Sequence, residues 1–284
     1  MTRLFGVIGS PIGHSLSPVM HTAALRAMRL DALYAPFEVP PRFLEPILRG
    51  LILAGVEGLN VTVPLKEAVL PLMDRVDPTA RSVGAVNTIV IRKRRTIGYN
   101  TDGVGFRRAL QELGWRARAV NAVILGSGGA ARAVAWELTR WAGSCLTIAN
   151  RHAARARRLE RWLVQRHPHT CVHAVSLKAL ALDEADLLVN ATTVGMRATD
   201  GLLIDPTMLH RRLLVYDLVY HRDTALVSAA RRRGCIAANG LSMLLYQGAE
   251  SLRLWLGRTP PIEVMREALL TAVNSAAWKA ERQP

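Results

Sequence analysis

The chain has 284 residues, half of them apolar, and is long enough for two ordinary domains with their own cores. It carries 37 lysines and arginines against 22 aspartates and glutamates, which gives a formal net charge of +15. No run of residues reaches the length of a membrane span and the N-terminus has no apolar signal region, so we expect neither a membrane span nor secretion but a cytoplasmic protein.

The excess of positive charge raises the alternative of a nucleic-acid-binding protein. The basic clusters, however, are spread along the whole chain at expected turns and on polar helix faces. There is no basic stripe interleaved with aromatic residues, and no helix-turn-helix or zinc signature. Solvated faces explain these clusters better, and a positive field would also attract an anionic substrate and cofactor. We therefore expect no nucleic acid and no membrane as a partner.

The first hundred residues alternate between short apolar runs and helical patterns. The predicted strands are 4–8, 33–39, 58–63, 85–91 and 96–99, the last two forming a hairpin around a basic turn. The predicted helices begin at Ser17-Pro18, with Ser17 as N-cap, at Pro41, at Leu65 and at Asp77-Pro78.

Two charged residues of this part have two possible interpretations. Lys66 would lie in the first turn of the helix that begins at Leu65, where the helix dipole disfavours a cation. It is either a surface lysine or an amine whose pKa is lowered for acid–base chemistry. Asp102 is placed to cap the next helix, 104–113, and a cap alone would explain it.

The rest of the chain continues the α/β alternation, with two sheets that separate near Asp102. Further strands are predicted at 120–125, 146–149, 170–175, 187–192, 213–218 and 235–237. Further helices are predicted at 131–141, beyond Arg155, at 224–233, from about 241 through Trp255, and from Pro260 to about Trp278. The residues after that, 279–284, are expected to be frayed.

The stretch from Ala119 to Arg155 has the pattern of a dinucleotide-binding unit. Gly126, Gly128 and Ala131 fit the glycine fingerprint between a strand and a helix, where backbone N–H groups approach a pyrophosphate. An ordinary left-handed turn is the alternative for a glycine triplet taken alone. A second strand at the right distance favours the functional interpretation.

The residues at the end of that second strand indicate which dinucleotide is bound. An NAD site usually has an acidic residue there, whereas this chain has Asn150-Arg151 and then Arg155, with no acid before Leu159. Guanidinium groups suit a 2′-phosphate, so we predict NADP, although arginines are common surface residues in this chain. The three cysteines, Cys145, Cys171 and Cys235, are scattered and show neither metal spacing nor a disulfide framework, so we expect inert thiols and no metal.

Several motifs taken together resemble the shikimate dehydrogenase family. They follow the family's order over nearly the whole chain: Ser15-Leu16-Ser17-Pro18, Asn60-Val61-Thr62-Val63-Pro64-Leu65-Lys66, Gly84-Ala85-Val86-Asn87-Thr88, Asn100-Thr101-Asp102-Gly103, Gly126-Ser127-Gly128-Gly129-Ala130, Asn190-Ala191-Thr192 and Gly240-Leu241-Ser242-Met243-Leu244 with Gln247.

The resemblance implies an NADP-dependent oxidoreductase that reversibly reduces 3-dehydroshikimate to shikimate in aromatic amino-acid biosynthesis. It also implies an α/β fold with an N-terminal substrate domain, 1–101 plus 241–284, and a Rossmann-like NADP-binding domain, 102–240, with the active site in the cleft between them. A monomer or a homodimer is expected.

The resemblance assigns a role to each matching position. Lys66 and Asp102 match the catalytic pair. The substrate-binding positions are Ser15, Ser17, Asn60, Thr62, Asn87, Asp102, Tyr220 and Gln247. The cofactor-binding positions are Gly126, Ser127, Gly128, Gly129, Ala130, Asn150, Arg151, His152, Arg155, Leu218 and Gly240.

One departure bears on the cofactor: His152 stands where the family often has threonine after Asn-Arg. A hydroxyl contact to the 2′-phosphate is then lost, and a histidine donor can replace it. Two alternatives to the main prediction are a quinate/shikimate dehydrogenase or paralogue with relaxed NAD use, and a non-enzymatic nucleotide sensor on the same fold. Retention of Lys66 and Asp102 argues against the sensor.

Overall fold

The computed structural model describes residues 2–116 and 119–275. The chain divides into two compact units, one formed by the residues up to Phe106 together with Leu244–Asn274, the other by Arg107–Met243. Both units are α/β, which confirms the predicted fold class. The part of the last predicted helix beyond 275 and the predicted frayed tail lie outside the described residues.

The first unit contains a mixed six-stranded sheet in the order β2-β1-β3-β5-β6-β4. Its strands are β1 (Arg3–Gly9), β2 (Ala32–Glu38), β3 (Val56–Val61), β4 (Arg75–Val76), β5 (Thr88–Arg92) and β6 (Arg95–Tyr99). Strand β1 is parallel to β2 and β3, while β5 is antiparallel to both β3 and β6. The β5–β6 hairpin was predicted, and Lys93 and Arg94 turn it with φ of 50° and 63°. The carboxyl ends of β1 and β3 therefore meet at one edge of the sheet.

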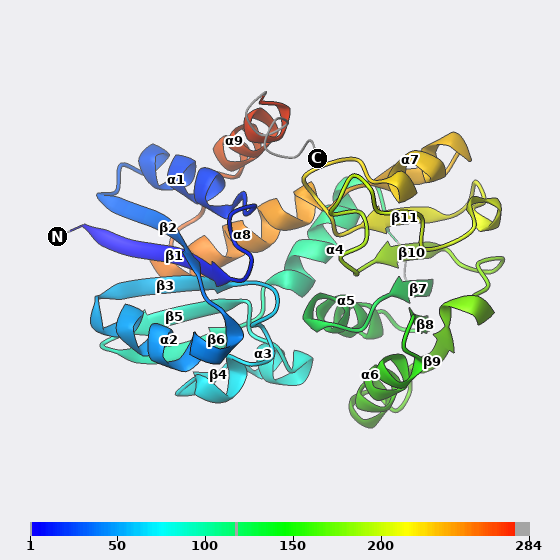
Figure 1. Ribbon diagram of the computed structural model, residues 1–284, viewed down its shortest axis with the longest axis horizontal. Coiled ribbons are helices and arrows are strands. Elements are labelled where there is room, and N and C mark those ends of the chain that lie inside the picture. Colours follow the sequence, from blue (N-terminus) through cyan, green and yellow to red (C-terminus); the bar gives the residue numbers. More distant parts are fainter. Residues whose placement is uncertain (1, 117–118, 276–284) are drawn as a thin grey trace. The chain divides into compact units, whose positions relative to one another are not determined.

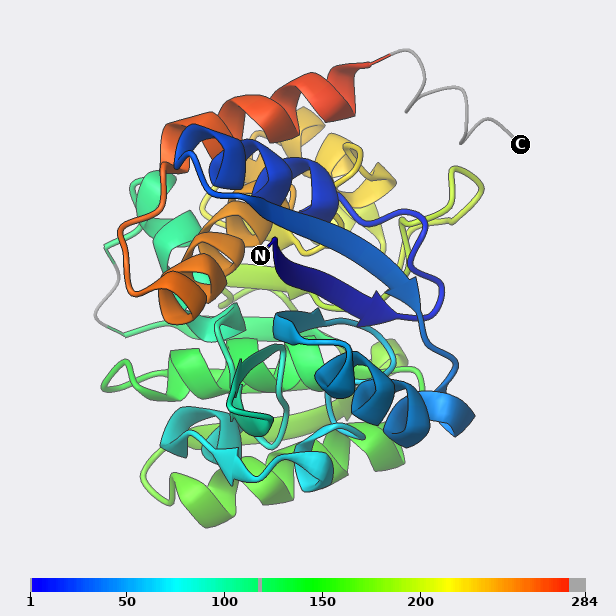
Figure 2. The same ribbon diagram turned by 90° about the vertical axis from the view of Figure 1, so that its left-hand side faces the viewer.

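Helices cover both faces of this sheet (Figure 1). They are α1 (Ser17–Ala27), α2 (Leu44–Leu53), α3 (Pro78–Val83), α8 (Leu241–Leu256) and α9 (Ile262–Asn274), with the 3₁₀ turns η1 (Pro41–Phe43) and η2 (Leu70–Leu72). Helix α2 contributes Leu44 and Leu48 to a core with strands β1, β3 and β5. On the other face Trp255 of α8 stacks on Phe5, and α9 lies beside α1 (Figure 2).

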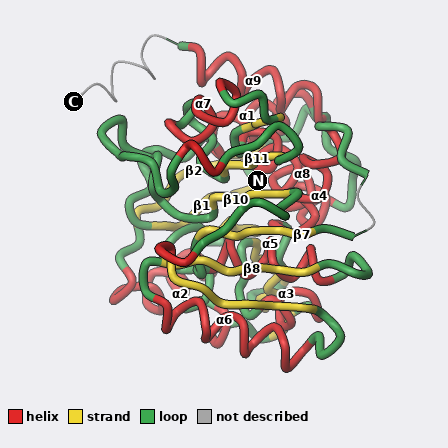
Figure 3. The backbone as a smooth tube through the Cα atoms, turned by 90° about the vertical axis from the view of Figure 1, so that its right-hand side faces the viewer, coloured by secondary structure: helices red, strands yellow, loops and turns green. Residues whose placement is uncertain are grey.

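The second unit contains a fully parallel sheet in the order β12-β11-β10-β7-β8-β9. Its strands are β7 (Asn121–Leu125), β8 (Cys145–Asn150), β9 (Cys171–Ser176), β10 (Leu187–Asn190), β11 (Leu214–Asp217) and β12 (Ile236–Ala238). The central strands lie side by side in Figure 3. Read outward from β7, this is the doubly wound order of dinucleotide-binding folds, whose switch point between β7 and β10 is where such folds bind ligands.

The central strands of the second unit, β7, β10 and β11, are almost entirely buried, because helices and loops cover both faces of a parallel sheet there. The helices are α4 (Asp102–Glu112), whose start belongs to the first unit, α5 (Gly129–Thr139), α6 (Ala153–Arg166) and α7 (Ala225–Arg232), with 3₁₀ turns η3 (Leu177–Ala179) and η4 (Pro206–Met208). One core joins Leu125, Leu188 and Val215 of three neighbouring strands.

Two local predictions in the first unit are wrong. No helix begins at Leu65: residues 63–69 form turns that lead to η2, because Pro71 has no N–H to continue a helix. Ser17 does not cap α1 either. Ser17 is the first helical residue, and its N–H donates to the Ser15 hydroxyl over 3.2 Å. The side chain of Ser15 therefore stabilises the turn that leads into α1.

The prediction of inert, separate thiols is wrong for two of the three cysteines. Cys145 and Cys171 lie opposite each other in the register of β8 and β9 and form a disulfide. Pairing across adjacent strands depends on sheet register, which the spacing of cysteines along the chain does not reveal. Cys235 is the buried free cysteine. Among the described residues, no helix has the length and apolar character needed to span a membrane.

A buried histidine couples the stability of the first unit to pH. The His21 ring is fully buried and stacks on Tyr34, with 4.4 Å between the ring centroids, and burial lowers its pKa to about 3. The unfolded chain therefore binds a proton near pH 6.5 that the folded chain rejects, so stability falls as the pH drops below about 6.5.

We expect His21→Phe, which keeps the stacking, to lose less stability on acidification than the parent chain. The difference in the free energy of unfolding between the two chains should change by about 2 kcal/mol between about pH 6.5 and pH 5, at about 1.4 kcal/mol per pH unit. Urea unfolding at the two pH values measures it, with the exposed His169→Gln as control. Equal acid sensitivity in His21→Phe and the parent would contradict the role of His21.

Candidate active site

A lysine–aspartate pair lies in the first unit. The Lys66 Nζ donates to Asp102 Oδ2 over 2.5 Å, and the two side chains are 14% and 5% exposed. Lys66 comes from the turns after β3, and the Val86 N–H donates to its carbonyl oxygen over 2.8 Å, which fixes the turn against the segment before β5. Asp102 is the first residue of α4. The pair is thus mostly withdrawn from water, with the ammonium the more accessible member.

Asn87 holds the second oxygen of the aspartate. Its Nδ2 donates to Asp102 Oδ1 over 2.8 Å and lies 3.3 Å from Gln247 Oε1, while its own Oδ1 accepts from the Thr101 N–H over 2.8 Å. The carboxylate oxygens of Asp102 are thus engaged by Lys66 and Asn87, so a helix cap alone, the alternative interpretation, does not account for this residue. Because both oxygens of the Asp102 carboxylate are held, the carboxylate fixes the direction of the Lys66 ammonium. A catalytic cation requires such a fixed orientation.

A buried polar network supports these residues from behind. The Tyr34 hydroxyl donates to Asn60 Oδ1 over 2.8 Å, and Asn60 Nδ2 donates to the Ser251 hydroxyl over 2.9 Å. The Ser251 and Thr88 hydroxyls are 2.7 Å apart. Asn60 was predicted to contact substrate, but its amide is engaged inside the unit. Sequence reasoning missed Thr88 and Ser251 as members, and their only signal was a hydroxyl on an otherwise apolar strand or helix face.

Hydroxyl groups lie where the parallel strands β1 and β3 end. Ser15 and Ser17 follow β1, and Thr62 follows β3, with its N–H donating to the Ile8 carbonyl over 2.9 Å. Ser15 and Thr62 are half-buried and Ser17 is buried. A Cβ on Gly9 would lie 2.4 Å from the Thr62 side chain, so glycine at that position leaves room for Thr62. The structure thus places these three predicted residues at one edge of the first sheet.

Gln247 and Tyr220 belong to different units. Gln247, on α8, joins the Asn87 network of the first unit and donates to the Leu244 carbonyl over 2.9 Å. Tyr220 follows β11 in the second unit, where its ring lies 5.9 Å from the ring of His221. Of the predicted substrate-binding set, Tyr220 alone lies in the second unit.

The glycine turn of the second unit has the geometry that a dinucleotide needs. Gly126 has φ of +111°, and a Cβ there would lie 2.9 Å from the Ala191 carbonyl oxygen, so only glycine fits. Gly128 precedes α5 in an extended conformation, and no side chain caps the helix. The N–H groups at the start of α5 therefore remain available to an anion, with Gly129 and Ala130 in the first turn.

The end of β8 is tied to this turn. The Asn150 Nδ2 donates to the Ser127 hydroxyl over 2.6 Å, and Asn150 Oδ1 accepts from the His152 N–H over 3.0 Å. Arg151, His152 and Arg155 are all exposed at the start of α6. Within the described residues neither of these arginines has an acidic partner. Unneutralised guanidinium groups next to the glycine turn suit a phosphate.

Leu218 and Gly240 approach each other through their backbones. A Cβ on Gly240 would lie 2.3 Å from the Leu218 carbonyl oxygen, and the Gly240 N–H donates to the Val219 carbonyl over 3.0 Å. Both lie just beyond the carboxyl ends of strands, Leu218 after β11 and Gly240 after β12. In a doubly wound sheet this is the edge where ligands bind.

A doubly wound parallel sheet with an open glycine turn, in the same chain as an α/β unit that carries a withdrawn lysine–aspartate pair, defines a dinucleotide-dependent oxidoreductase. Residues 7–89 match the family model described as the shikimate dehydrogenase substrate binding domain, and residues 240–270 match that of the shikimate 5′-dehydrogenase C-terminal domain.

Whole-chain comparisons agree with these matches. Over 279 residues the chain is 46% identical to the shikimate dehydrogenase (NADP(+)) of Symbiobacterium thermophilum, covering 96% of this chain and 95% of the relative. A crystal structure of a shikimate dehydrogenase in complex with NADP+ has a TM-score of 0.91 at 36% identity, covering 96% of each chain. The enzyme of Thermus thermophilus in complex with NADP(H) and shikimate has a TM-score of 0.85 at 37% identity, covering 95% of this chain and 99% of that one. The chain belongs to the shikimate dehydrogenase family, as the motifs predicted.

Proposed function

We propose that this chain catalyses the reversible reduction of 3-dehydroshikimate to shikimate with NADPH, a step toward chorismate and the aromatic amino acids. The observation that carries the proposal is the Lys66–Asp102 pair, held by Asn87, in a chain whose relatives are NADP-dependent shikimate dehydrogenases. We assign substrate binding to the first unit and NADP binding to the second. The boundaries expected from the sequence, after 101 and 240, lie close to Phe106 and Met243.

Lys66 acts on the oxygen of the reacting carbonyl. NADPH supplies the hydride for the carbonyl carbon, so negative charge develops on the oxygen. The Lys66 ammonium stabilises that charge and donates a proton, and in the oxidation direction it accepts one. Asp102 orients the ammonium through Oδ2, while Asn87 prevents the carboxylate from rotating.

The remaining residues bind the substrate. The Ser15 and Ser17 hydroxyls, at the entry of α1, bind the substrate carboxylate, because anions are favoured at a helix N-terminus. Thr62, Asn87, Asp102, Gln247 and Tyr220 bind ring hydroxyls and the carbonyl oxygen. Asn60 acts indirectly, because its side-chain amide is hydrogen-bonded to Ser251 and Tyr34 inside the first unit.

The residues of the second unit fit NADP. The glycine turn from Gly126 to Ala130 and the uncapped start of α5 hold the pyrophosphate. Asn150 positions Ser127, and Arg151 and Arg155 bind the 2′-phosphate, with His152 as a further donor. Leu218 and Gly240 lie beside the nicotinamide, where the close backbone approach leaves no space for a side chain at 240.

The test is shikimate oxidation, followed by nicotinamide absorbance with NADP⁺ and NAD⁺ side by side and with quinate as second substrate. We expect turnover of shikimate with NADP⁺ and little with NAD⁺ or quinate. Comparable rates with NAD⁺ or quinate would instead assign the chain to the quinate/shikimate dehydrogenases. A folded protein without turnover on either substrate would overturn the proposal.

Removal of the Arg151 guanidinium should weaken NADP⁺ selectively. A charge-assisted hydrogen bond contributes about 1.5–3 kcal/mol, so we expect Arg151→Ala to raise the KM for NADP⁺ by about 10–100-fold and that for NAD⁺ by less than about 3-fold. Steady-state kinetics with both cofactors measures the split, and Arg157→Ala, exposed on the helix α6 that follows Arg151, is the matched control. Equal weakening of both cofactors would exclude a 2′-phosphate contact.

We further propose that the protein works in the cytoplasm as a monomer or a homodimer, without nucleic acid as a partner. The absence of an apolar signal region and of a membrane-span pattern supports the compartment, and the spread of the basic clusters along the whole chain supports the exclusion of nucleic acid. Light scattering after size exclusion gives the oligomeric state. Binding to random-sequence DNA at moderate salt would contradict the exclusion of nucleic acid.

A further inference from the structure

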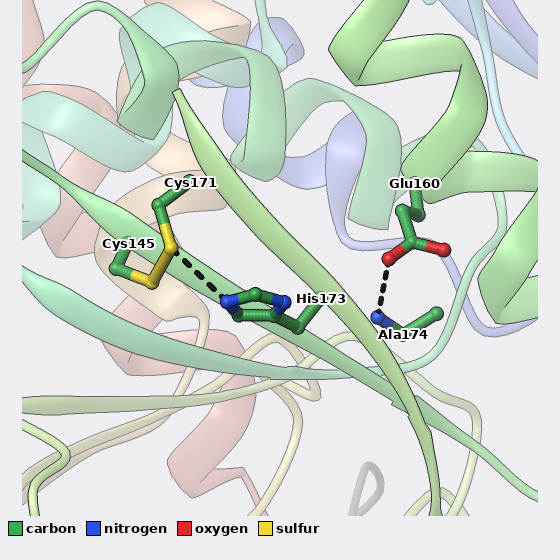
Figure 4. The surroundings of a disulfide bond; sticks show 5 residues. All are labelled: Cys145, Glu160, Cys171, His173 and Ala174. Atoms are coloured by element: carbon green, nitrogen blue, oxygen red, sulfur yellow. Dashed lines mark hydrogen bonds between the residues drawn. A yellow bond between two sulfur atoms is a disulfide. The ribbon is translucent and has the colours of Figure 1, made fainter. Parts of the chain in front are cut away.

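Two cysteines and a histidine gather on one side of the second sheet, away from the glycine turn. Cys145 begins β8 and Cys171 begins β9, with their Cα atoms 4.5 Å apart in a parallel register. His173 follows two residues after Cys171, so its side chain emerges on the same face, and its Nε2 lies 3.2 Å from the Cys171 Sγ (Figure 4). We call these residues the Cys145–Cys171–His173 cluster.

The cluster is accessible to solvent. Cys171 and His173 are exposed on β9, the outer strand of the sheet, and Cys145 is half-buried on the neighbouring β8. The alternating residues, such as Leu146 and Val172, are buried on the opposite face. On that other side Glu160 of α6 accepts from the Ala174 N–H over 3.0 Å and so holds β9 in place (Figure 4). The cluster therefore sits on a rigid, paired part of the sheet rather than on a loop.

The cluster is separate from the cofactor-binding residues proposed above. Cys145 is at the amino end of β8 and Asn150 at its carboxyl end, five steps of about 3.3 Å along one strand. A ligand at one end therefore does not touch the other end directly. Neither the proposed reaction nor the NADP site uses Cys145, Cys171 or His173.

The ligand atoms have the chemistry and the spacing of a soft-metal site. The two Sγ atoms and a ring nitrogen of His173 all lie within 4.8 Å of one another. Two thiolates and an imidazole form a ligand set that zinc takes in tetrahedral sites, with metal–sulfur distances of about 2.3 Å that place the sulfurs about 3.8 Å apart. Once the disulfide is reduced, rotation about the two Cα–Cβ bonds reaches such a separation without movement of the paired backbone.

We propose that the reduced Cys145–Cys171–His173 cluster binds one thiophilic divalent cation of the zinc class, with water as fourth ligand, and that disulfide formation abolishes the site. A small dithiol reductant reduces the Cys145–Cys171 disulfide and so makes the site available. The reductant gives up two electrons and two protons and becomes a cyclic disulfide, while Cys145 and Cys171 become thiols. Metal binding then releases the two thiol protons to solvent, and neutral His173 binds through a ring lone pair. The two thiolates cancel the charge of the cation, so the loaded site adds no positive charge to a chain that already carries +15.

The test is a titration with Co²⁺, whose thiolate charge-transfer absorption reports sulfur ligands directly. Protein reduced with a dithiol and freed of reductant by gel filtration under argon should bind one equivalent and develop that absorption. Protein oxidised with glutathione disulfide should not develop it. Zn²⁺ should displace the Co²⁺ and remove the band. A thiol count in denaturant confirms the redox state, with three thiols in the reduced chain and one in the disulfide form.

Variants assign the ligands. Cys145→Ser and Cys171→Ser should each abolish the thiolate band at stoichiometric Co²⁺, and His173→Ala should weaken binding by about tenfold or more, as expected for loss of a ligand or its orienting group. The matched controls are Cys235→Ser, which removes the buried third thiol, and His169→Ala, which removes a nearby exposed histidine. Both controls should bind Co²⁺ like the parent chain. Absence of the band in fully reduced parent protein, or its persistence when both Cys145 and Cys171 are serine, would overturn the proposal.

Discussion

Replacement of Lys66 by alanine should lower kcat for shikimate oxidation by about 10²–10⁴-fold, with a much smaller change in KM. The ammonium interacts most strongly with the oxygen when that oxygen carries charge in the transition state, and only weakly with the neutral ground state. The 2.5 Å contact with Asp102 and the 14% exposure of the side chain place the charge where little water competes with it. Steady-state kinetics with saturating NADP⁺ separates kcat from KM.

Two further variants make the Lys66 experiment specific. Lys66→Arg retains a cation but changes its shape and its acidity, so we expect it to keep KM near the parent value without restoring kcat. Lys93→Asn removes a lysine from the exposed β5–β6 turn, where asparagine tolerates the positive φ, and should leave both constants unchanged. A large rise in KM with an unchanged kcat in Lys66→Ala would identify Lys66 as a binding group instead.

Replacement of Asp102 by asparagine should lower kcat by about 10²–10³-fold and should also raise the KM for shikimate. The carboxylate accepts from Lys66 on one oxygen and from Asn87 on the other. An asparagine has one acceptor oxygen and one NH₂ group, so the NH₂ group must face one of these two donors. Lys66 or Asn87 is then displaced, and the ammonium loses both its counter-charge and its orientation.

The Asp102 variant needs a control for folding, because its side chain is almost fully buried. Asp31→Asn, an exposed change in the same unit, should leave kcat and KM unchanged. Circular dichroism and the urea midpoint should show Asp102→Asn folded at the assay temperature. If the folded variant retains the parent kcat and changes KM alone, Asp102 contributes to substrate binding and not to the positioning of Lys66.

The amino-acid sequence determined most of the local structure and the family. Apolar runs bounded by turn residues located the strands, because period and burial are local properties of a chain. The glycine turn was predicted from Gly126 and Gly128 between a strand and a helix, and in the structure Gly126 lies so close to Ala191 that a Cβ would collide with it. The hairpin around Lys93 and Arg94 and the start of α3 at Asp77-Pro78 were also predicted from the sequence.

Tertiary structure alone decided which distant residues meet. The local sequence around Asp102 suggests a helix cap. In the structure, however, its carboxylate oxygens accept from Lys66 and Asn87, which are 36 and 15 residues away in the chain. Ser251 joins Asn60 across 191 residues, and Cys145 reaches Cys171 only because β8 and β9 pair in a particular register. Such contacts follow from the packing of whole strands and helices, for which local periodicity carries no signal. The sequence thus specified the elements and the residue types of the site, while the fold specified the partner of each polar atom.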